Sequence, residues 1–363
     1  MASKDTTTSD EANVKPPAND QSEIQSDQAF SDASEITYTP PSSSTSMTSA
    51  SSFGGPASLN EIDALPQPSG VANISVREYI YFLPYPLPPN TPVPYSIHLP
   101  DHNPLNLRLN PAEPTFVLVL TSPRGTFVDL RLFKPARTGD TALANKGERS
   151  GLDWAFAGTS TSRPAVDQHP AEDEKGLDNV THSTWTHWLD SRYPVGSRVI
   201  PVDEGDMYPI DAVRTLEHGH GYQPLLKATM THEEMWRDVE ATSTNAKGSK
   251  MCVVLRLQDE KFGARGVVVR VGQYCQGIIS LVTEKSCTVE RWEFHGGDAE
   301  RQNHLPSGLE RERTEAEMWK RTARVGDLFL PCAVTFRTEI VKVGGVVKYK
   351  DYVWVVEEAW EWD

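Results

Sequence analysis

The sequence is poor in positive charge and has no long apolar run, and both deficits exclude classes of protein. Its 363 residues include 35 Lys and Arg against 50 Asp and Glu, which gives a net charge of −15. Such a chain lacks the basic surface that binds phosphate backbones, so nucleic acid is not an expected partner. No apolar run approaches the ~20 residues of a membrane span, and the N-terminus lacks the apolar core of a signal peptide. We therefore expect no membrane insertion.

Cysteine is scarce, and its spacing indicates the redox environment. The four cysteines are Cys252, Cys275, Cys287 and Cys332. They form no CxxC pair, which predicts reduced thiols in a cytosolic or nuclear protein.

Catalytic and metal-binding motifs are also absent from the sequence. It contains no GxSxG, no P-loop and no GxGxxG. The segment His232–Trp236 begins like a zincin helix, but Trp236 stands where the second histidine would be, so no zinc site is predicted. We expect a protein that is not an enzyme and that has no cofactor and no metal site.

Residues 1–70 differ in composition from the rest of the chain. They are rich in Ser, Thr and Pro, and contain ten acidic residues against two basic ones. Their few apolar residues show no periodicity, so the segment cannot bury enough apolar surface to offset the entropy of ordering. The sequence predicts a disordered acidic tail.

The remainder of the chain has the pattern of an all-β protein. Residues 116–121 are apolar on both faces, the Ser122–Gly125 turn follows, and residues 128–132 alternate, which together predict a hairpin. A second series of β-rich stretches runs from Cys252 to Trp360. Between the two series, Thr231–Glu240 has a capping-box spacing and predicts a short helix.

The two β series follow a similar plan, in which Gly158 and Gly277 occupy equivalent places. A glycine inside a strand often marks a bulge or bend. Many short strands in two similar halves predict two tandem copies of an antiparallel β-sandwich or β-barrel, joined by the short helix and each with its own core. We expect the N-terminal copy over residues 71–228 and the C-terminal copy with the linking helix over residues 229–363.

Aromatic residues supply the candidate cavity or interaction sites. They are Trp154, Phe156, Trp185, His187, Trp292, Trp354, Trp360 and Trp362. Small barrels usually fill their interiors with such side chains, so core packing competes with a role in lining a cavity. Near the C-terminus the tryptophans stand among acidic residues, and two interpretations are open: a docking surface for a basic partner, or closure of the second barrel.

Several motifs in this order are similar to those of the fungal Hri family, which is named after an interaction with a casein kinase I homologue. They are DWAFAGT (Asp153–Thr159), HWLDS (His187–Ser191), MYP (Met207–Pro209), EEMW (Glu233–Trp236) and VGQYCQGIIS (Val271–Ser280). The resemblance implies two lipocalin-like barrels in a cytoplasmic and nuclear protein with no assigned catalytic activity. The family's barrels also resemble nitrobindin-type haem proteins, but their GxWxGxG strand is absent here, and no haem is expected.

Two functions are compatible with these observations. The first is a non-enzymatic protein-interaction module, with a casein kinase I homologue as the partner that the resemblance implies. The alternative is a lipocalin-like carrier of a small apolar ligand, which requires a cavity of a few hundred cubic ångströms. Filled barrels would exclude the carrier.

Overall fold

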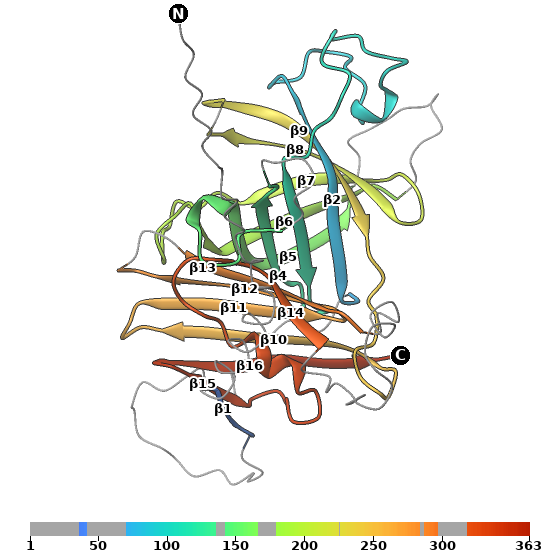
Figure 1. Ribbon diagram of the computed structural model, residues 1–363. Helices are drawn as coiled ribbons and strands as arrows, with labels where there is room; N and C mark the ends of the chain where they lie inside the picture. Colours follow the sequence, from blue (N-terminus) through green and yellow to red (C-terminus); the bar gives the residue numbers. More distant parts are fainter. Residues whose placement is uncertain are drawn as a thin grey trace, which may run out of the picture.

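The protein is all-β, and its strands form two sheets that lie against each other (Figure 1). The computed structural model describes residues 36–41, 70–135, 142–165, 179–224, 226–283, 287–296 and 318–363. Within these ranges one sheet is a closed barrel and the other is an open sheet of eight strands. The predicted all-β class is confirmed.

The barrel is an antiparallel meander in which each strand pairs with the next and the last pairs back with the first. Its strands are β2 (Asn73–Leu83), β3 (Thr115–Thr121), β4 (Thr126–Phe133), β5 (Leu152–Pro164), β6 (Thr181–Asp190), β7 (Asp203–Pro209), β8 (Arg214–Gln223) and β9 (Ala228–Asp238). The predicted hairpin is β3–β4, and its turn is as expected: the Gly125 amide donates to the Ser122 carbonyl at 2.9 Å, and Gly125 has a φ of +81°. The barrel extends to Asp238, beyond the boundary predicted after residue 228.

The predicted helix at Thr231–Glu240 is wrong, because most of this segment belongs to strand β9. Residues of β9 pair with β2 on one side and with β8 on the other, so two ladders use the backbone amides and carbonyls of the segment. A capping box satisfies only two amides at a helix start. The long-range ladders outweigh this local preference, which is the usual way in which tertiary context overrides propensity.

The second sheet is open, so the prediction of two tandem barrels is confirmed only for the first. Its strands lie in the order β1-β15-β16-β10-β11-β12-β13-β14. Their bounds are β1 (Ile36–Thr39), β10 (Lys250–Asp259), β11 (Ala264–Val271), β12 (Tyr274–Leu281), β13 (Cys287–Phe294), β14 (Trp319–Val325), β15 (Val346–Tyr349) and β16 (Tyr352–Trp362).

Segments from elsewhere in the chain lie at both ends of the open sheet. At one end, β1 pairs with β15 and is the edge strand of the sheet within the described ranges. At the other end, residues 144–147 bind β14: the Gly147 amide donates to the Arg324 carbonyl at 3.1 Å and the Arg324 amide to the Ala144 carbonyl at 2.9 Å. A covered edge does not recruit other strands, so this segment protects the β14 edge although the sheet does not close.

Strand β1 lies within the predicted disordered tail and corrects that prediction for four residues. Ile36 and Tyr38 are half-buried against the second sheet, and the Tyr38 hydroxyl accepts from the Lys342 amide at 3.0 Å. Most of the remaining tail, residues 1–35 and 42–69, lies outside the described part of the chain.

The two sheets share one apolar core, so the cores of the two halves are not fully separate, although the open sheet also has a core of its own on its far face. Outward side chains of the barrel wall pack against one face of the open sheet. The barrel contributes Ile74, Leu118, Leu120, Val128, Leu130, Leu132, Ala155, Ala157 and Leu189, and the open sheet contributes Cys252, Val254, Val267, Val269, Val271, Ile278, Cys287, Val289, Ala323 and Val325. The opposite face of the open sheet packs on residues 328–341, which include the short 3-10 helix η5 (Cys332–Phe336).

Buried polar side chains fix how the two sheets meet. The Gln276 amide nitrogen donates to the carbonyls of Leu118 and Val128, at 2.7 and 2.8 Å. Arg291 donates to Gln276 Oε1 at 3.2 Å and to the Leu130 carbonyl at 3.0 Å. Burial lowers the pKa of Arg291 to about 10. These bonds specify one alignment of the open sheet on β3 and β4, which apolar contacts alone do not do.

The two equivalent glycines have different surroundings. A register shift between Ala157 and Gly158 confirms the predicted bulge in β5. Gly277 shows no such shift and pairs regularly with both β11 and β13. A Cβ at Gly158 would lie against the backbone of Thr186 and 2.9 Å from the Trp188 amide nitrogen.

We expect Gly158→Val to lower the free energy of unfolding by about 1–3 kcal/mol, because backbone atoms of β6 block the new side chain. Since the core is shared, hydrogen exchange should accelerate in β11 and β12 as well as in the barrel. Gly221→Val is the control, because a Cβ there meets nothing within 4 Å. Faster exchange confined to the barrel strands would contradict the shared core.

Candidate functional site

The barrel interior is polar, because the apolar face of its wall is turned outward. In β4, Val128, Leu130 and Leu132 pack in the core shared with the open sheet. Alternation along the strand then directs Phe127, Asp129 and Arg131 into the barrel. The candidate site is this interior.

A cavity of about 320 Å³ occupies the barrel interior. Its lining residues are Asn73, Ser75, Val119, Thr121, Phe127, Asp129, Arg131, Phe156, Ser160, Ser162, Thr181, Ser183, Trp185, Asp203, Met207, Thr215, Glu217, Trp236 and Asp238. Ser162 and Asp238 are exposed, whereas Asp129 and Glu217 are buried. The cavity thus leads from the surface to a set of buried charges.

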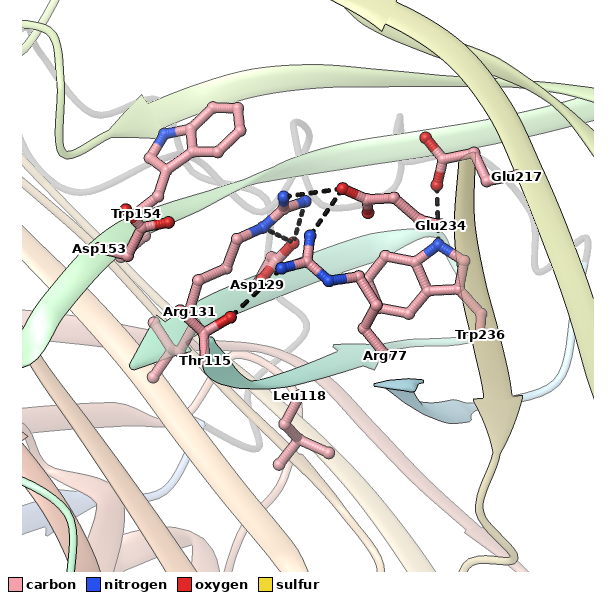
Figure 2. A network of polar contacts seen from close by, with 12 residues as sticks. Arg77, Thr115, Leu118, Asp129, Arg131, Asp153, Trp154, Glu217, Glu234 and Trp236 are labelled. Carbon is pink, nitrogen blue, oxygen red and sulfur yellow. Dashed lines mark hydrogen bonds and ion pairs between the residues drawn. The ribbon is translucent and has the colours of Figure 1, made fainter. Parts of the chain in front are cut away.

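These buried charges form a network of ion pairs centred on Glu234 (Figure 2). Glu234 Oε1 accepts from Arg77 at 2.6 Å and from Arg131 at 3.2 Å. Arg77 also binds Glu113 at 2.6 Å, and Arg131 binds Asp129 Oδ2 at 3.0 Å. Buried charges are tolerated only when they are paired in this way.

The pKa values of the network reflect burial and pairing. Burial alone would raise the pKa of Glu234, but Arg131 and Arg77 lower it to about 2. For Asp129 burial is the stronger effect, and its pKa is raised although Arg131 opposes this. Two buried oxygens in the network, Asp129 Oδ1 and Glu234 Oε2, have no hydrogen-bond partner among the residues that the structure places.

A second polar group lies beside the network. The Trp236 indole donates to Glu217 Oε2 at 2.8 Å, and His232 Nε2 lies 3.7 Å from Glu217 Oε1. Burial raises the pKa of Glu217, and the nearby carboxylates Glu234 and Asp203 raise it further, whereas His232 opposes the shift. Burial would lower the pKa of His232, but Glu217 and Glu234 raise it.

The candidate residues of the first half lie in or next to the cavity wall. Trp185 and Phe156 line the cavity. His187 is buried behind Phe156, with its ring stacked at 4.2 Å. Asp190 binds both His187 Nδ1 and the Trp154 indole, each at 2.9 Å. Asp190 therefore fixes two of the candidate residues in the wall.

The candidate residues of the second half do not reach this cavity. Trp292 and Trp354 are buried in the core on the far face of the open sheet. Trp360 and Trp362 are half-buried against the core that joins the two sheets. The Trp360 indole donates to Glu358 at 2.7 Å.

The acidic side chains near the C-terminus also have internal partners. Glu358 is 1% exposed and accepts from Ser122 and Thr126 of the barrel, at 2.7 and 3.0 Å. Glu357 pairs with Arg256 at 2.7 Å. Of the two interpretations, the structure thus favours packing over a free docking surface.

The sequence analysis missed the charges of the barrel interior. The alternation places Asp129 and Arg131 on one face of the strand, but a polar face is ordinarily expected to contact solvent. Glu234 was not recognised because its segment was expected to form a helix. A signal was present in β4 itself, where an acid and an arginine two residues apart share one strand face.

Two features are absent from the described ranges. No group of three or more His, Cys, Asp or Glu side chains there is placed to hold a metal ion. No helix there has the length and apolarity required to cross a bilayer.

The low pKa of Glu234 predicts acid sensitivity. The carboxylate stabilises the fold fully above its unfolded pKa near 4.5, and the contribution is lost as pH falls toward 2. We expect this group to contribute about 3 kcal/mol to the pH dependence of unfolding over that window. Glu234→Gln should lack this component in urea titrations, whereas Glu78→Gln, in a half-exposed surface pair with Arg237, should keep it. Equal acid sensitivity of Glu234→Gln and the wild type would contradict the assignment.

Comparisons with known proteins agree with the motifs found in the sequence. The family described as Protein HRI1 matches residues 101–358. A crystal structure of the uncharacterized protein YLR301w from Saccharomyces cerevisiae is similar with a TM-score of 0.50 and 17% identity, covering 80% of this chain and 99% of that one. This likeness supports the fold. No curated protein sequence matches the chain. Because the family match spans most of the described barrel and open sheet, the chain belongs to the HRI1 family.

Proposed function

We propose that the closed barrel is a binding module that takes a small molecule into its interior. The observation that carries this proposal is the cavity of about 320 Å³, which leads from exposed Ser162 and Asp238 to buried Asp129 and Glu217. Its volume lies at the lower end of the range of ligand sites, ~300–1,000 Å³. A barrel filled by its own side chains would have no such space.

The lining indicates a ligand with both apolar and polar groups. Aromatic rings on one part of the wall, Phe127, Phe156 and Trp185, offer apolar contact. Serines, threonines and carboxylates make up most of the remainder. A purely apolar ligand, as expected of a lipocalin-like carrier, would leave these polar groups without partners when it displaces water.

The proposal does not require catalysis. The role as a protein-interaction module, with a casein kinase I homologue as partner, stays a prediction from the sequence. No contact of the C-terminal tryptophans favours it, because Trp360 and Glu358 are used inside the molecule.

Nuclear magnetic resonance with labelled tryptophan provides a direct test. A small-molecule library should yield compounds that shift the indole resonances of Trp185 and Trp236, which line the cavity. The resonances of Trp292 and Trp354 should not move, since these rings are buried in the distant core.

Thr181→Trp provides the matching variant, because Thr181 lines the cavity and the larger side chain would fill it. We expect loss of binding for every such compound. Thr184→Trp is the control, because Thr184 lies on the same strand but on its other face, outside the cavity lining. A library without compounds that shift Trp185 and Trp236, or equal binding by the two variants, would overturn the proposal.

A further inference from the structure

The cavity wall carries an excess of negative charge. Four carboxylates line it, those of Asp129, Asp203, Glu217 and Asp238, against the single guanidinium of Arg131. Arg131 is already engaged with Asp129 Oδ2 and Glu234 Oε1. The charged groups that the wall presents to a ligand are therefore mainly carboxylates, and its one cation is held by protein carboxylates.

One of these acceptors is buried and unused. Asp129 is 2% exposed, and its Oδ1 has no hydrogen-bond partner within the described part of the chain. Leaving a buried carboxylate oxygen without a donor costs more than a typical hydrogen bond contributes. Because Asp129 lines the cavity, a ligand that donates a hydrogen bond at this place would remove that cost.

Aromatic rings accompany the carboxylates. Asp203 is paired in register with Trp185 across β6 and β7, so a carboxylate and an indole stand side by side on the wall. Another ring of the wall already accepts a cation, since the Arg131 guanidinium lies 5.3 Å from the centre of Phe156. Ring faces attract ammonium and guanidinium groups, and the attraction grows when water is excluded.

The burial of the carboxylates determines the sign of the charge that the site prefers. Burial raises the pKa of Asp129 and of Glu217, so both are costly to keep ionised without further positive charge nearby. A cation would supply that charge, whereas an anion would add repulsion. A neutral ligand would use the acceptors without offsetting their charge.

Resting on the proposed binding function, we propose that the barrel cavity selects a compact organic cation that joins an ammonium or guanidinium group to an apolar or aromatic body. Its charged group would lie among Asp129, Asp203 and Glu217, and its body would lie against Trp185 and Phe156. The cavity of about 320 Å³ limits the ligand to a small molecule.

Matched probes of similar size test the preference for charge. They are benzylamine and benzylguanidine as cations, benzyl alcohol as the neutral form and benzoate as the anion. Calorimetric titration of the full chain at pH 7 should show both cations binding at least about tenfold more tightly than benzyl alcohol, which is about 1.4 kcal/mol. Benzoate should bind more weakly than benzyl alcohol. The indole resonances of Trp185 and Trp236 should report the bound cations.

Two variants of adjacent residues distinguish the effect of a carboxylate in the cavity wall from the effect of the protein's net charge. Asp203→Asn removes a carboxylate of the wall and should weaken both cations about tenfold while leaving benzyl alcohol unchanged. Glu204→Gln removes a carboxylate on the opposite side of the same strand, where Glu204 lies 3.6 Å from His182. This variant should change neither the affinity for the cations nor that for benzyl alcohol. Equal effects of the two variants would overturn the proposal, because the attraction would then be unspecific.

The outcomes distinguish this proposal from the function on which it rests. One outcome is that benzyl alcohol or benzoate binds as tightly as the cations and shifts the resonances of Trp185 and Trp236. That result would keep the cavity as a binding site but overturn its preference for cations. Cations that shift neither indole would overturn the preference as well. The library screen and Thr181→Trp decide the binding function independently of charge.

Discussion

Glu234 holds the two arginines of the barrel interior, and the barrel depends on this pairing. The outer face of the wall is committed to the core shared with the open sheet, so strand alternation directs Arg77, Asp129 and Arg131 inward. There the side chains are removed from water, and ionised groups remain only if they bind one another. Because the outer face is apolar, the charged residues of these strands lie inside the barrel, and there their pairing depends on Glu234 from β9, the strand that closes the barrel.

The same arrangement explains why space remains inside. Where the wall carries long charged side chains, they fill the interior and pair across it. Toward the exposed end the wall carries small side chains, among them Ser160, Ser162, Thr181 and Ser183. Branched apolar residues at these positions would fill a barrel of eight strands. The change in side-chain size along β5 and β6 thus produces a cavity next to a fixed set of charges.

Local pattern predicted much of the fold. The β3–β4 hairpin and its Ser122–Gly125 turn follow from alternation and turn chemistry, and the bulge at Gly158 follows from a glycine within a strand. Strand β9 could not be predicted from the local pattern. Its capping-box spacing favours a helix, whereas the hydrogen bonds that make it a strand go to β8, the preceding strand, and to β2, which is distant in sequence. The candidate site was predicted in part, through Phe156 and Trp185. The charged residues of the site were not predicted, because the sequence pattern of a polar strand face is the same whether that face contacts water or a partner charge.

The open sheet packs on one side of the barrel and bonds to its backbone. A second closed barrel would have presented a convex wall, whereas an open sheet offers one face to the barrel and the other to residues 328–341. Gln276 and Arg291 bind backbone carbonyls of β3 and β4, so the barrel wall that carries Asp129 and Arg131 is held in place from outside. A site whose walls are fixed before binding loses less entropy when a ligand enters. In this chain the half without the cavity thus determines how well the cavity is formed.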